Sequence, residues 1–165
     1  MVALVIRPYS VAGAPRLRYQ EQNSEQTLAE ALEEYYRVNQ GVVSRPATLA
    51  PESAALFRSH DICHVIFGLD TTLADETMAD TRTLLSSDVG WKTYTGYIND
   101  PLAKAVFKEL GLLRTITVTL RTLPRILRAI GENRRMKKKW PWRPPEAYFG
   151  RTLAELRREY GIRVI

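Results

Sequence analysis

The seventeen residues from His60 to Glu76, HDICHVIFGLDTTLADE, constrain the fold of this chain more than any other stretch. They contain both histidines of the sequence, His60 and His64, which are four residues apart. On an α-helix this spacing puts both rings on one face, about 6 Å apart along the axis. The stretch therefore predicts a helix that can offer two ring nitrogens to one metal ion.

The residues after His64 predict a turn and a second helix. Gly68 is typical of a helix end, polar residues follow it, and apolar helical pattern lies on both sides. If the two helices pair antiparallel about residue 70, position 64 faces Glu76 and position 60 faces Asp80. The predicted hairpin thus brings a carboxylate opposite each histidine. A metal site is the favoured interpretation, a satisfied polar cluster is the alternative, and Asp80 is an additional candidate ligand.

The motif, HD-x2-H followed by eleven residues and a glutamate, resembles the signature of the fourth coenzyme Q (ubiquinone) biosynthesis protein family. Gly68 and the C-terminal LRREYGI also fit that family, whereas Asp75 stands where the family usually has glycine. The resemblance implies a mainly helical protein that holds a polyprenyl lipid. Its metal-binding set in this chain would be His60, Asp61, His64 and Glu76.

The resemblance also implies an activity and partners. The family is linked to replacing the C1 carboxyl of a polyprenylated hydroxybenzoate ring by hydroxyl, so a metal-dependent decarboxylase is the expected enzyme. A non-catalytic lipid-binding scaffold of a quinone biosynthesis complex is the alternative. The expected partners are a prenylated quinone precursor or prenyl lipid, other quinone-biosynthesis enzymes, and a second copy of the chain in a homodimer.

The ligand types narrow the choice of metal. We expect Zn²⁺ first, because two histidines and a carboxylate leave a position open for water or substrate. Fe²⁺ or another divalent ion is the alternative, since the same set suits non-haem iron and exchanging carboxyl for hydroxyl is an oxidation. Asp61 has three candidate roles, as a ligand, as a partner to a histidine, or as a catalytic proton shuttle.

Basic residues are concentrated in one segment. Between Arg121 and Arg143 there are nine basic residues and one acid, Glu132, so this segment carries +8 and the remainder of the chain −2. We expect residues 121–145 to form a basic surface segment, either a solvated face, a nucleic-acid site or a contact with an anionic membrane. Nucleic acid is disfavoured, because only Trp140 and Trp142 interleave with the basic residues.

A membrane contact is the favoured interpretation of residues 121–143. Tryptophans beside lysines suit a membrane interface, and basic residues are attracted to anionic lipid. The chain has no run of eighteen apolar residues and no signal-peptide pattern. We therefore expect a cytoplasmic protein, peripheral to the inner face of the membrane.

Length and periodicity predict an all-α, single-domain helical bundle over residues 1–165, in which an antiparallel helix pair carries the metal motif. Residues 1–22 are expected to be mostly irregular and residues 86–98 to form a loop. The apolar face of residues 102–130 is expected to line a groove for the lipid tail. The predicted helices are 23–40, capped by Asn23 or Ser24, then 51–67, 73–85, 100–110, 112–130 with a kink near Pro124, and 149–160.

Overall fold

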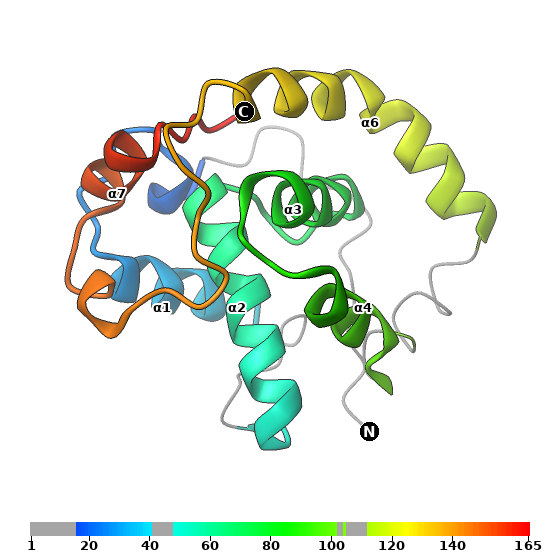
Figure 1. The fold of residues 1–165 in the computed structure, drawn as a ribbon, viewed down its shortest axis with the longest axis horizontal. Helices are drawn as coiled ribbons and strands as arrows, with labels where there is room; N and C mark the ends of the chain where they lie inside the picture. Colours follow the sequence, from blue (N-terminus) through cyan, green and yellow to red (C-terminus); the bar gives the residue numbers. More distant parts are fainter. Residues whose placement is uncertain (1–15, 41–47, 102–103, 105–111) are drawn as a thin grey trace.

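The computed structural model describes residues 16–40, 48–101, 104 and 112–165, and these residues are mainly helical (Figure 1). They form no β-strand, only two isolated bridges, which confirms the all-α prediction. The elements are η1 (Arg18–Gln20), α1 (Leu28–Val38), α2 (Pro51–Phe67), α3 (Leu73–Ser86), α4 (Trp91–Asn99), α6 (Leu112–Asn133), η3 (Glu146–Tyr148) and α7 (Leu153–Tyr160).

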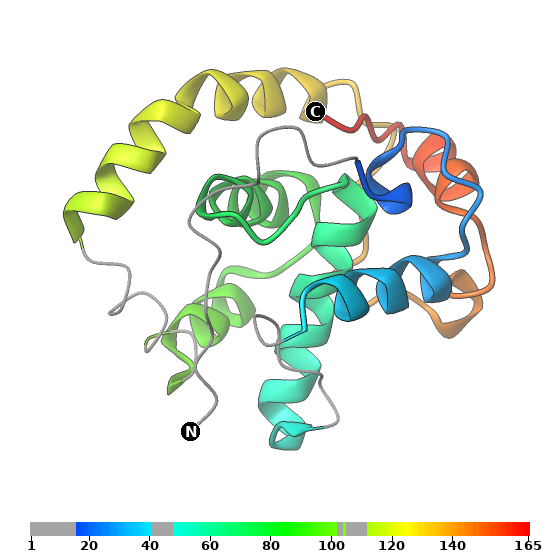
Figure 2. The same ribbon diagram turned by 180° about the vertical axis from the view of Figure 1, so that it is seen from behind.

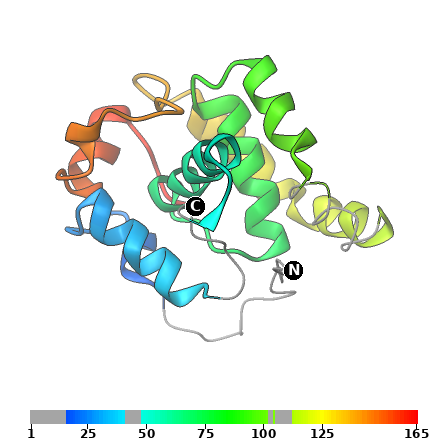
Figure 3. The same cartoon turned by 90° about the horizontal axis from the view of Figure 1, so that it is seen from below.

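Helix α2 stands at the centre of the bundle. Helices α1 and α7 lie on one side of it, and α3, α4 and α6 lie on the other (Figures 1 and 3). Helix α2 packs against α1, α3 and α4, while α6 packs extensively along α3. Seen from behind, α6 runs in an arc over α3 (Figure 2). The central helix is thus held from both sides.

The α2–α3 hairpin forms as the sequence predicts. Pro51 occupies the first turn of α2, where its missing N–H costs no hydrogen bond. Gly68 ends α2 with φ 71°, and a Cβ added there would lie 2.7 Å from Val164 Cγ1, so this position requires glycine. Thr72 caps α3 by accepting a hydrogen bond from the Asp75 N–H. The predicted helices 51–67 and 73–85 are confirmed, with α3 one residue longer.

The predicted starts of the first and last helices are wrong. Helix α1 begins at Leu28 rather than near Asn23 or Ser24, and α7 begins at Leu153 rather than Phe149. Capping boxes fix both starts, Thr27 with Glu30 and Thr152 with Glu155. The backbone before α1 instead bonds to the start of α7, because the Ser24 and Gln26 carbonyls accept from the Ala154 and Leu153 N–H groups.

The loop predicted over residues 86–98 is also wrong, because residues 91–99 form α4. The predicted helix 100–110 lies largely outside the described residues, of which only Asp100, Pro101 and Lys104 belong to it. Residues 1–15 of the predicted irregular start lie outside them too. The helical interpretation of the stretch after residue 111 is confirmed, since α6 continues through Pro124 to Asn133.

Trp140 and Trp142 are buried, with 0% and 4% exposed. Trp140 packs edge-on against Tyr160 at 5.0 Å between ring centroids, and its carbonyl accepts the Asp88 N–H. These two rings belong to the core cluster around α7. The prediction that they face a membrane interface is therefore wrong.

Arg157 of α7 ties the C-terminal end of α2 to the rest of the core. Its side chain is fully buried and donates hydrogen bonds to four main-chain carbonyls, those of Ile66, Val65, Glu21 and Tyr19, at 2.5–2.9 Å. The first two belong to the last turn of α2, where helix carbonyls lack an intrahelical partner. Burial lowers the pKa of Arg157 to about 10, so the guanidinium stays charged at neutral pH and complements the negative helix end.

We expect Arg157→Lys to destabilise the protein by about 3 kcal/mol, because an ammonium cannot reach all four carbonyls and leaves some of them unpaired. Urea unfolding followed by circular dichroism measures the change. The control is Arg158→Lys at the neighbouring exposed position. An equal loss of stability in both variants would show that the four hydrogen bonds of Arg157 do not stabilise the fold.

Candidate metal centre

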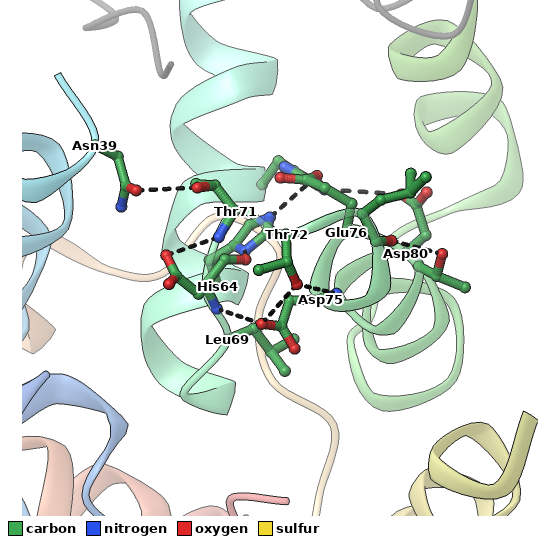
Figure 4. A network of polar contacts seen from close by, with 12 residues as sticks. Asn39, His64, Leu69, Thr71, Thr72, Asp75, Glu76 and Asp80 are labelled. Carbon is green, nitrogen blue, oxygen red and sulfur yellow. Dashed lines mark hydrogen bonds and ion pairs between the residues drawn. The ribbon is translucent and has the colours of Figure 1, made fainter. Parts of the chain in front are cut away.

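The hairpin gathers His60, His64 and Glu76 into one group. One ligand atom from each residue lies within 4.8 Å of the other two. His64 Nε2 is 3.4 Å from Glu76 Oε2 (Figure 4). His60 Nε2 is 3.7 Å from Asp80 Oδ1. The predicted pairings of positions 64 with 76 and 60 with 80 are confirmed.

The ring of His64 is held in one orientation. It is fully buried, and its Nδ1 lies 3.0 Å from the main-chain carbonyl oxygen of Asp70, to which an Nδ1–H donates. This bond directs Nε2 toward Glu76. Metal-binding histidines are commonly oriented by such a hydrogen bond on the second nitrogen. The turn between α2 and α3 therefore supplies the carbonyl that aims the ligand.

The ring of His60 is held by aromatic contacts. It stacks on Tyr97 of α4 with centroids 4.7 Å apart and packs edge-on against His64 at 4.8 Å. Tyr97 was not expected at this site, because residues 86–98 were predicted to form a loop. The signal was the three-residue spacing of Trp91, Tyr94 and Tyr97, which is typical of one helix face.

Three buried polar atoms at this centre have no hydrogen-bond partner among the described residues, namely His60 Nε2, His64 Nε2 and Asp80 Oδ1. Buried atoms of this kind are normally paired, because leaving one unsatisfied costs about 1–3 kcal/mol. A single cation near both nitrogens would satisfy them. Zinc bonds of about 2.0–2.2 Å at tetrahedral angles place ligand atoms about 3.4 Å apart, so the side chains must move together by about 1 Å or more to bind one ion.

The carboxylates lie on the open side of the group. The side chains of Glu76 and Asp80 are 25% and 26% exposed, whereas those of His64 and His60 are 0% and 5% exposed. Asp80 lies beside the group of three and within reach of His60. The arrangement is therefore two histidines at the base of the site and two carboxylates toward solvent.

Asp61 lies next to this group rather than in it. It is buried, and its Oδ2 accepts a 2.9 Å hydrogen bond from the Tyr36 hydroxyl. Burial raises the pKa of Asp61 to about 6, although His60, His64 and the Tyr36 bond oppose the rise. Of its predicted roles, metal binding stays a prediction, while exchange of a proton near neutral pH agrees with this pKa.

The ion pair at the base of the site shifts the pKa values of both its members. Burial alone would lower the pKa of His64, but the charge of Glu76 raises it to about 9. Burial likewise opposes ionisation of Glu76, yet His64 holds the pKa of that carboxyl below its usual range. Without a metal ion, the imidazolium proton therefore faces Glu76 at neutral pH.

Metal uptake at pH 7 should release about one proton per ion, because Nε2 of His64 must lose its proton to become a ligand. Affinity for Zn²⁺ should rise from pH 6 and level off above about 9. The stabilisation that the ion pair gives to the metal-free protein has the opposite trend, being full below about pH 6.5 and lost as the pH rises through about 9. Calorimetric titration in buffers of different ionisation enthalpy measures the protons, and a pH-independent affinity would contradict this assignment.

His64→Ala and His60→Ala should each weaken zinc binding by more than about 100-fold, because each removes a ligand nitrogen. Glu76→Gln should weaken it somewhat less, because the amide keeps one oxygen and loses the negative charge. Elemental analysis of protein purified without a tag gives the occupancy, and titration gives the affinity.

The matched control for Glu76→Gln is Asp75→Asn. Asp75 precedes Glu76 on α3, but its carboxylate binds Arg125 of α6 at 2.6 Å rather than the histidines. Full occupancy in all three site variants, or an equal loss in the control, would show that the metal site is misplaced.

Comparison of the chain with protein-family models, curated proteins and solved structures gives no match. The expected relation to a coenzyme Q biosynthesis family thus rests on the motif residues alone. The geometry of the His60, His64 and Glu76 group, which could hold a metal ion, stands independently of that relation.

Proposed function

We propose that this protein is a metal-dependent enzyme acting on the ring of a polyprenylated hydroxybenzoate. The observation that carries the metal dependence is the pair of buried Nε2 atoms of His60 and His64 beside Glu76, neither of which forms a hydrogen bond within the described structure. The choice of ring and tail comes from the resemblance of residues 60–76 to the coenzyme Q family signature. Zn²⁺ is the first choice of ion and Fe²⁺ the alternative.

The open side of the group suits an approaching substrate. A divalent ion there would stabilise negative charge as it develops on the ring. Asp80 Oδ1, close to His60 and itself unpartnered within the described structure, is a candidate fourth ligand. With the two histidines and Glu76, it would hold the ion, and the ion would supply a positive charge for a substrate carboxylate.

Asp61 is the proposed proton-exchanging group. When the bond from ring C1 to the carboxyl breaks, carbon dioxide leaves and the electron pair stays on the ring carbon until a proton or an oxidant takes it. A carboxyl with a pKa of about 6 can give up and regain a proton near neutral pH. Replacement by hydroxyl additionally requires dioxygen, one atom of which enters the ring, and a two-electron reductant that, with two protons, converts the other oxygen atom to water.

Aromatic side chains next to the site support an aromatic substrate. Tyr97 already stacks on His60, and Tyr94 and Trp91 continue from it along α4 with ring centroids 6.3 and 6.2 Å apart. Rings of this kind favour offset or edge-on contacts with another ring. Contacts with other quinone-biosynthesis enzymes and a homodimer are part of the same proposal.

Metal-loaded protein should release carbon dioxide from a short-chain prenylated hydroxybenzoate, and metal-free protein should not. The assay is run with Zn²⁺ and Fe²⁺, with and without oxygen, with the ring product identified by mass spectrometry. Asp61→Asn should lower turnover by about 100-fold or more while it keeps the metal, because it removes the proton but leaves the histidines in place. Binding of the prenylated ring without turnover under all these conditions would instead indicate a lipid-binding scaffold.

A further inference from the structure

Helix α6 carries an apolar stripe that nothing in the described structure covers. Its members, here called the outer stripe, are spaced by four, three and four residues and are 46–65% exposed: Ile116, Leu120, Leu123 and Leu127. This spacing puts them on one face of the helix. Large apolar side chains are normally buried, so a row of four on one exposed helix face indicates a binding surface.

The outer stripe faces away from the protein. The buried residues of α6 include Thr122 and Ala129, each two positions after a member of the stripe, Leu120 and Leu127. Two residues correspond to about 200° around a helix, so the stripe lies on nearly the opposite side from the face that packs against α3. Within residues 116–127, the apolar face that was expected to line a groove thus points outward.

A row of arginines runs beside the outer stripe. Arg121 and Arg128 each follow a leucine of the stripe by one residue, about 100° around the helix. Both are exposed, and neither forms an ion pair within the described part of the chain. Arg134 and Arg135 extend the positive charge past the end of α6 and are also exposed. The exposed surface of α6 is therefore apolar along one edge and basic along the other.

We propose that α6 lies in the plane of an anionic membrane surface, with the outer stripe in the acyl region and the arginine row among the lipid headgroups. Helices that lie in the membrane interface have this combination of an apolar face and a basic face. Long arginine side chains reach the headgroups from the edge of such a face. No helix in the described residues is long and apolar enough to cross a membrane, so this helix would rest on the surface.

Charge favours lipid over a second copy of this chain. Two α6 helices paired through their outer stripes would bring their arginine rows together. The one acid in residues 121–143, Glu132, could not offset them, because it faces inward with 8% exposed and pairs with Arg135 and Arg163. An anionic lipid surface offers negative charge along the whole row. This inference extends beyond the metal site and does not depend on it.

The proposed membrane contact on α6 differs from the one expected around the lysines at positions 137–139. Lys138 binds Glu159 of α7 at 2.5 Å, and Lys137 Nζ donates to the Arg158 carbonyl. These two lysines are therefore engaged with α7 and are less available to lipid than Arg121 and Arg128. The proposed membrane contact is the exposed side of α6 itself.

Co-sedimentation of the full chain with vesicles tests the proposal. Wild-type protein should bind vesicles of phosphatidylcholine and phosphatidylglycerol and bind phosphatidylcholine alone far more weakly, with the difference reduced by salt. Leu120→Gln with Leu127→Gln should weaken binding about 100-fold by removing two inserted side chains. Arg121→Gln with Arg128→Gln should weaken binding to the anionic vesicles about thirtyfold.

The matched charge control is Arg37→Gln with Arg158→Gln, on α1 and α7, which lie on the other side of α2 (Figure 1). It removes the same charge and should change binding by less than about threefold. Unfolding midpoints and zinc content should match the wild type in every variant, since all six positions are exposed and distant in sequence from residues 60–76. Unchanged vesicle binding in the leucine variant would overturn the proposal. So would a wild-type protein that forms a dimer and does not bind vesicles, if the leucine variant is monomeric.

Discussion

The metal centre and the α2–α3 hairpin both depend on the last turn of α2, which contains His64. Arg157, about ninety residues further along the chain, completes the hydrogen bonding of that turn. Helix carbonyls at a C-terminus have no partner within the helix, and here they are buried. Arg157 donates to two of them, those of Val65 and Ile66, while the Leu69 N–H bonds to the His64 carbonyl. Position 64 is therefore fixed by the turn that follows it and by a cation on α7. A rigid backbone at this point is what allows one imidazole to be aimed at one carboxylate.

The same hairpin connects the metal centre to α6. Asp75 precedes Glu76 and binds Arg125, which lies on the inner side of α6. Helix α3 thus carries one carboxylate directed at the histidines and an adjacent one directed at α6. Packed helices lie about 8–10 Å apart, so the centre is only one helix layer from α6. Any displacement of α6 along α3 would be transmitted to the residue next to a proposed ligand.

Local patterns in the sequence predict those parts of the fold that local interactions decide. The four-residue spacing of the histidines and the glycine at position 68 were sufficient for the hairpin and for the pairing of His64 with Glu76. The start of α1 has a local signal, the Thr27–Glu30 capping box, but Asn23 and Ser24 offer a competing one. Residues before Thr27 stay outside the helix, where the Ser24 and Gln26 carbonyls accept hydrogen bonds from the Ala154 and Leu153 N–H groups of α7. Likewise, Trp140 is buried because Tyr160 and the backbone after α3 surround it, although its neighbours in sequence are lysines. Tertiary contacts between distant segments override sequence context at these positions.

The proposed substrate, which has a long apolar tail, would relate the metal centre to the exposed face of α6. The tail of a prenylated ring is stable in the bilayer and costly to expose to water, in proportion to its apolar area. If α6 lies in the interface, the tail could stay in lipid while only the ring moves to the partly exposed carboxylates of Glu76 and Asp80. The protein then has no need to enclose the tail in a deep cavity of its own. Under that arrangement the chain supplies the base of the site and the membrane supplies the environment of the tail, and shortening the tail should weaken capture from vesicles more than it weakens chemistry at the ring.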